Sequence, residues 1–136
     1  MNSVFLGFFI VFQVLTIQCK SQPDWTYREP DVWVENGIIY SRGSCAKLAT
    51  ETLTMVTAET RARGNISRAL AMGEISGYSS IPAENDNRSE FNYNGIKGEL
   101  GLTIIKENFF TKNDTGYVLI SCIGAKLYAE PHEEDL

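Results

Sequence analysis

The stretch SCAKLATETLTMVTAETRARGNISRALAMG, residues 44 to 73, carries the clearest structural signal in the chain. It contains no proline and many helix-forming residues, so it predicts one long helix. Ser44 is suited to cap its N-terminus, and Gly73 is suited to end it. At about 100° per residue, one broad face collects the apolar side chains Cys45, Leu48, Ala49, Leu53, Met55, Val56, Ala62, Ile66 and Leu70. Many of these side chains are small, which lets a helix approach a sheet closely.

Glu59 is the one carboxylate that falls inside this apolar face. One interpretation is a buried carboxylate that performs acid–base chemistry. The other is that Glu59 leans outward to meet Arg63 or Arg61, or accepts hydrogen bonds from backbone groups. We favour the second interpretation, because Glu59 and Arg63 have the favourable i, i+4 order on a helix.

The segments around the predicted helix read as strands and turns. Residues 37–43, GIIYSRG, are rich in β-branched and aromatic residues, and residues 73–80 are a second candidate strand. Residues 96–112 predict a long strand, in which Gly98 and Gly101 suggest a bulge or a bend. A tight turn at 113–116 leads into a last strand. Residues 23–37 are expected to be irregular, and residues 81–95 are expected to form a loop or the tip of a long hairpin. The order predicts an α+β fold, with one long helix on an antiparallel sheet of about three to five strands.

The N-terminus predicts export. Residues 4–17, VFLGFFIVFQVLTI, have the length of a signal-peptide core and are short for a membrane span. Cleavage after Ser21 would leave a single domain at 22–136 with a short acidic C-terminal tail. Alternatively, cleavage after Gln18 would leave Cys19 as a lipidated first residue, although Gln18 is a poor residue to precede a lipidated cysteine. A third alternative is that residues 4–17 remain as an uncleaved N-terminal anchor. All three alternatives stay open.

Composition excludes some function classes. The chain has 136 residues and a formal net charge of −5, and its basic residues are scattered. Nucleic-acid binding needs Lys and Arg gathered on one face, so nucleic acid is not an expected partner. Cys45 and Cys122 form a disulfide after export, or they remain two buried free thiols.

Chemical motifs are scarce. His132 is the single histidine and lies in the acidic tail, so neither a His-based triad nor a zinc site is expected. No glycine-rich phosphate loop is present. We therefore predict no catalytic, cofactor-binding or metal-binding residues. The alternative function is a small apolar-ligand-binding domain or cryptic enzyme with a pocket lined by Phe91, Tyr93, Phe109, Phe110 and Tyr128.

A series of short motifs resembles the LPP-twenty lipoprotein family of bacteria. They are PDW, GIIYSRGSC, RGNISRALA, GEISGY and DTGYVLISC, in this order over about residues 23 to 124. The matching positions are Pro23, Asp24, Trp25, Tyr40, Gly43, Ala58, Arg61, Ala62, Asn65, Ile66, Leu70, Ala71, Tyr117, Val118 and Leu119. The loop-like stretch 81–95 departs from the family, where more regular structure is expected.

The resemblance implies a helix-on-sheet fold, export, and in many members an anchor in the outer membrane. It also implies a cysteine a few residues before PDW as the lipid anchor, which here is Cys19. No catalytic residues carry over. The expected function is that of a non-enzymatic exported envelope protein, in the periplasm or at the outer membrane or cell surface. It would act by association with the membrane, with other envelope or surface proteins, or with itself.

Overall fold

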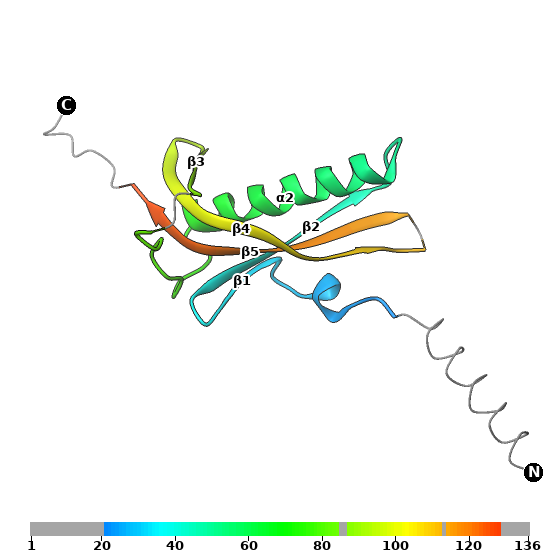
Figure 1. Ribbon diagram of the computed structural model, residues 1–136, viewed down its shortest axis with the longest axis horizontal. Helices are drawn as coiled ribbons and strands as arrows, with labels where there is room; N and C mark the ends of the chain where they lie inside the picture. Colours follow the sequence, from blue (N-terminus) through cyan, green and yellow to red (C-terminus); the bar gives the residue numbers. More distant parts are fainter. Residues whose placement is uncertain (1–20, 85–86, 113, 129–136) are drawn as a thin grey trace, which may run out of the picture.

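The computed structural model describes residues 21–84, 87–112 and 114–128. It confirms the α+β class: one long helix packs on a five-stranded antiparallel sheet (Figure 1). The elements are η1 (Asp24–Tyr27), β1 (Val32–Glu35), β2 (Ile38–Ala46), α2 (Glu51–Ala71), β3 (Ser89–Tyr93), β4 (Ile96–Phe110) and β5 (Thr115–Leu127).

The strands lie in the order β1-β2-β5-β4-β3, and every neighbouring pair is antiparallel. Three of the four pairs join strands that follow one another along the chain. The exception is β2 beside β5, which are separated in sequence by α2, β3 and β4. The helix lies on one face of the sheet, mainly over β2 and β5, and η1 lies on the other face (Figure 1).

The predicted helix begins seven residues too early. Residues 44–46 instead continue β2 and pair with residues 115–117 of β5. Ser44 therefore lies in a strand and does not cap the helix. Thr50 does, because its side chain accepts a hydrogen bond from the Leu53 N–H at 3.0 Å. The predicted C-terminus is confirmed: α2 stops at Ala71, and Gly73 follows with φ +67°.

The helix buries a narrower face than the sequence pattern predicted. The buried residues of α2 are Thr54, Ala58, Ala62, Ile66, Ala69 and Leu70. By contrast Leu48, Leu53 and Val56 are exposed, although the helical wheel placed them on the apolar face. Small side chains form the stripe of α2 that contacts β2, because they let the helix axis lie close to this strand. The position of the helix on the sheet therefore decides which of its side chains are buried. Thr54 is tolerated there because its hydroxyl donates to the Thr50 carbonyl at 2.8 Å.

The stretch before β2 is more regular than expected. Residues 23–37 contain a short 3₁₀ helix and a strand, and β1 pairs with residues 38–41 of β2. Trp33 stacks on Tyr40 with ring centroids 5.9 Å apart, and Trp25 meets Tyr117 edge-on at 6.5 Å. These two contacts hold the segment against Tyr40 of β2 and Tyr117 of β5. Tyr27, by contrast, is 66% exposed.

Two further boundaries differ from the predictions. Residues 73–80 form no strand, although the Ser79 N–H donates to the Gly37 carbonyl at 2.8 Å. A short strand, β3, lies instead inside the predicted loop 81–95, where it pairs with the start of β4. The register shift of β4 falls between Ile105 and Glu107 and not at its glycines. Gly98 and Gly101 are instead places where a Cβ would collide with backbone oxygens of β5.

Candidate functional site

Most of β4 forms an outer edge of the sheet. Strand β3 pairs with β4 only as far as Leu100. From 101 to 110, β4 has β5 on one side and, among the residues that the structure describes, no strand on the other. Figure 1 shows this half of β4 running beyond β3 towards the turn that joins it to β5. Such an edge offers unpaired backbone donors and acceptors to another chain.

The backbone groups that point outward from this edge follow from the alternation of an antiparallel ladder. The Thr111 N–H donates to the Thr115 carbonyl at 2.9 Å. Counting back in register, Phe109 and Glu107 bond to β5, so the peptide groups of Phe110 and Asn108 point outward.

The same reasoning holds for the part of β4 before residue 106, where the register shift between Ile105 and Glu107 forms a bulge. The Lys47 N–H donates to the Asp114 carbonyl at 2.7 Å, so the even-numbered residues of β5 bond to β2. Two of these, Ile120 and Cys122, face Ile105 and Thr103 of β4. Ile105 and Thr103 therefore also direct their backbone groups outward. The outward set is Thr103, Ile105, Asn108 and Phe110.

The edge is apolar on both faces and charged at its middle. Ile104 is 41% exposed and Ile105 is 47% exposed, and consecutive residues of a strand point to opposite faces. Lys106 lies in the bulge directly after Ile105, and Glu107 follows it. Both side chains are exposed. Exposed isoleucines on both faces favour a partner, whereas a bulge and charges discourage random strand pairing.

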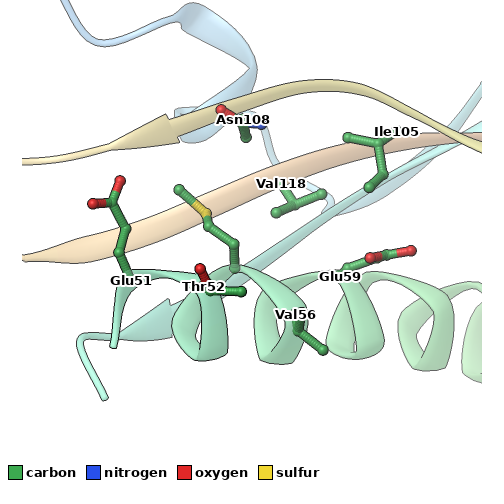
Figure 2. A pocket seen from close by; sticks show the side chains of 8 residues that line it. Glu51, Thr52, Val56, Glu59, Ile105, Asn108 and Val118 are labelled. Carbon is green, nitrogen blue, oxygen red and sulfur yellow. The ribbon is translucent and has the colours of Figure 1, made fainter. Parts of the chain in front are cut away.

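A groove runs between this edge and the first half of α2 (Figure 2). Its volume is about 400 Å³, and its lining residues are Glu51, Thr52, Met55, Val56, Glu59, Ile105, Asn108 and Val118. Figure 2 shows Ile105 and Val118 pointing from their strands towards the helix. The groove therefore has an apolar floor between two carboxylates of α2.

The carboxylates of the groove do not form an acid–base pair. The Glu59 carboxylate accepts a hydrogen bond from Arg63 at 2.8 Å, which confirms the interpretation that Glu59 leans out to Arg63. Glu51 lies about 12 Å away along the helix axis, at 1.5 Å per residue. The two carboxyl groups that hydrolyse a glycoside are about 5–9.5 Å apart. The arrangement is better suited to framing a bound chain than to hydrolysis.

The N-terminal segment reaches the same edge from the opposite face of the sheet. Ser21 and Pro23 line a depression together with residues 107–109 of β4. The Trp25 indole N–H donates to the Glu107 carboxylate. The start of the described chain, at residues 21–23, therefore lies beside the β4 edge.

Cys45 and Cys122 are free and buried, so of the two alternatives the structure has the free thiols and not the disulfide. In the β2–β5 register Cys45 lies opposite Gly116, whereas Cys122 lies opposite Ile39. The two cysteines are thus about 20 Å apart along the strands, and a disulfide needs Cα atoms within about 7 Å. Burial raises the pKa of the Cys122 thiol to about 11, so this thiol stays protonated at neutral pH. Cys19 and His132 lie outside the described residues.

The aromatic residues proposed for a ligand pocket do not gather in one place. Phe91 and Tyr93 lie on β3, beside residues 96–98 of β4. Phe109 and Phe110 lie at the other end of β4, about 36 Å away at 3.3 Å per residue. Phe91 packs against the core. A pocket built from this set is therefore wrong. The α2–β4 groove was missed, because its position depends on the register between helix and sheet.

An ion-pair network at the far end of α2 was also missed. The Arg68 guanidinium binds Asp31 at 2.9 Å and Glu74 at 3.4 Å. Burial lowers the pKa of Arg68, but its hydrogen bond to Asp31 and the charges of Asp31 and Glu74 raise it by more, so the net shift is upward. The network joins the end of the helix to the segment before β1, which is a structural role.

Comparisons of the chain with protein-family models, with curated proteins and with solved structures found no match. In the part of the chain that the structure describes, no helix is long and apolar enough to cross a membrane. The same residues hold no group of three or more His, Cys, Asp or Glu side chains placed to bind a metal ion.

Proposed function

We propose that this chain is a non-enzymatic exported protein of a bacterial cell envelope that acts by binding other protein chains. The observation that carries the proposal is the outer edge of β4. Its outward backbone groups at Thr103, Ile105, Asn108 and Phe110 lie beside exposed isoleucines and an apolar groove. An exposed sheet edge binds an extended segment by adding it as a further strand, and a groove beside the edge selects its side chains.

Export is supported by the apolar stretch 4–17 and by the resemblance to the LPP-twenty lipoproteins. In a lipidated form, Cys19 would hold the domain at the membrane through its acyl chains. Because Ser21 lies beside residues 107–109, such an anchor would keep the β4 edge near the bilayer. Cleavage after Ser21 would leave the same domain free in the periplasm.

Fractionation of a bacterial host that expresses the full chain tests the export proposal. We expect the protein in the envelope fractions, with a mature N-terminus at acylated Cys19 or at Gln22 by mass spectrometry. In the acylated case, Cys19→Ser shifts the protein from the membrane pellet. An intact chain beginning at Met1 and confined to the cytosol would contradict the proposal.

A second candidate function is the binding of a small apolar ligand in the α2–β4 groove. The groove volume of about 400 Å³ favours it, since ligand pockets span about 300–1,000 Å³. We expect such a ligand to raise the thermal unfolding temperature of the wild type but not of Ile105→Asp. A panel of fatty acids that shifts neither protein would remove this candidate.

A further inference from the structure

We infer that the outer edge of β4 pairs with the same edge of a second copy of this chain, forming a two-fold symmetric dimer with one continuous sheet. The inference rests on the proposed function and names the partner that fits the edge. It is carried by the spacing of the outward residues, by the charges between them and by the side from which the N-terminal segment arrives.

The outward residues are arranged symmetrically about the middle of the edge. Antiparallel strands bond where an outward residue of one strand faces an outward residue of the other. If Thr103 faces Phe110 of the second copy, then Ile105 faces Asn108, and the reverse pairs follow by symmetry. No other antiparallel register matches all four outward residues at once. The bulge of one strand then lies opposite the bulge of its partner.

The charges of the edge are complementary in the same register. Lys106 of one copy faces Glu107 of the other, and the two-fold axis repeats this pair. Cross-strand pairs of opposite charge stabilise a sheet, and like charges directly opposite each other destabilise it. The charges and the bulge that disfavour pairing with an unrelated strand therefore match when the partner is a second copy. In this register the exposed Ile104 would lie beside Phe109 of the second copy, and Ile105 beside Asn108, so each gains a cross-strand neighbour on its own face.

The two-fold symmetry would let both copies of the dimer attach to the same membrane. Pairing of two sheet edges by a two-fold axis perpendicular to the sheet leaves corresponding faces on the same side. In one copy, α2 and η1 lie on opposite faces of the sheet (Figure 1). In the dimer both copies of α2 would therefore lie on one face, and both η1 segments would lie on the other. Trp25 meets Glu107 and Tyr117 on that second face. Two N-terminal anchors would therefore point to the same membrane.

Charge reversal with rescue tests the register. We expect the mature protein, as secreted by its host, to form a weak dimer by light scattering, with a dissociation constant on the order of micromolar. Lys106→Glu and Glu107→Lys each place like charges opposite each other and raise that constant by about tenfold. The double variant K106E/E107K restores the dimer. Lys97→Glu is the matched control, because Lys97 is exposed on the part of β4 that β3 covers.

Cross-linking identifies the contact even where a charge variant folds poorly. We expect Ile105→Cys in one tagged copy and Asn108→Cys in a differently tagged copy to form a disulfide-linked heterodimer on oxidation. The mixture of Ile105→Cys with Lys97→Cys should form none. The native Cys45 and Cys122 do not interfere, because both are buried.

A wild type that stays monomeric at about 1 mM, far above the expected micromolar range, overturns the inference. A dimer whose dissociation constant is unchanged by both charge reversals, and which forms no 105–108 cross-link, uses another surface. That result also overturns the inference. A monomer that is still exported overturns self-pairing alone, and leaves the edge for a strand of a different envelope protein. A chain that dimerises as inferred but remains in the cytosol contradicts only the proposed export.

Discussion

Gly43 of β2 lies directly against Ala58 of α2. A Cβ built at residue 43 would stand 1.9 Å from the Ala58 carbonyl oxygen and 2.6 Å from the Ala62 backbone nitrogen. Ser41 lies two residues before Gly43 on the same face of β2. Its hydroxyl donates to the Ala62 carbonyl at 2.7 Å. The helix thus rests on the backbone of β2. This close approach fixes which face of α2 is buried, and it leaves Val56 beside the groove.

Gly43→Ala should destabilise the fold by about 2–3 kcal/mol, since backbone and not a flexible side chain must move. Gly64→Ala is the matched control: an added Cβ at this position of α2 meets nothing within 4 Å. That control should stabilise the protein by about 0.5–1 kcal/mol, the helix propensity difference between Ala and Gly. Urea unfolding followed by circular dichroism measures both. Equal effects of the two variants would contradict the packing described for Gly43.

Thr50→Ala should lower the free energy of unfolding by about 1 kcal/mol, because the Leu53 N–H loses its capping acceptor. Ser44→Ala is the comparison, since the sequence pattern placed the cap there and the structure places exposed Ser44 in β2. We expect Ser44→Ala to change stability by less than about 0.5 kcal/mol. If chemical denaturation shows a larger loss of stability for Ser44→Ala than for Thr50→Ala, the helix begins at residue 44 as the sequence pattern predicted.

The buried Cys122 thiol makes stability depend on alkaline pH. Burial raises its pKa in the folded chain to about 11, from an ordinary value of 9.0. Its contribution is therefore complete below pH 9 and is lost as pH rises towards and through 11. The difference in unfolding free energy between wild type and Cys122→Ala should shrink by about 2 kcal/mol over this range. A difference that stays constant from pH 8 to 11 would show that Cys122 does not titrate with a raised pKa.

The sequence predicted the type of fold because strong local signals agree. The stretch 44–73 lacks proline, and a tight turn separates the two predicted strands 96–112 and 116–128, so the helix and the β4–β5 hairpin followed directly. The helix start was wrong because residues 44–46 take their structure from β5, a partner about 70 residues away in the chain. Local helix propensity could not register that pairing.

The candidate site could not be predicted from the sequence for a similar reason. Whether β4 is an edge depends on where β3 stops pairing, at Leu100, and β3 itself lies in a stretch that reads as a loop. The bulge after Ile105 carries no glycine signal, whereas the glycines at 98 and 101 serve close contacts with β5. Glu59 was interpreted correctly, because an i, i+4 pair with Arg63 is local.

Residue-resolved amide hydrogen exchange tests the self-pairing of β4 most directly, when measured by nuclear magnetic resonance on dilute and concentrated protein. The amides of Ile104, Glu107 and Phe109 bond to β5 and should exchange slowly at both concentrations. Those of Thr103, Ile105, Asn108 and Phe110 should exchange fast when dilute and become protected when concentrated, in wild type and in K106E/E107K. In K106E the same protection should need about tenfold more protein. Fast exchange of these four amides at every concentration would contradict the account.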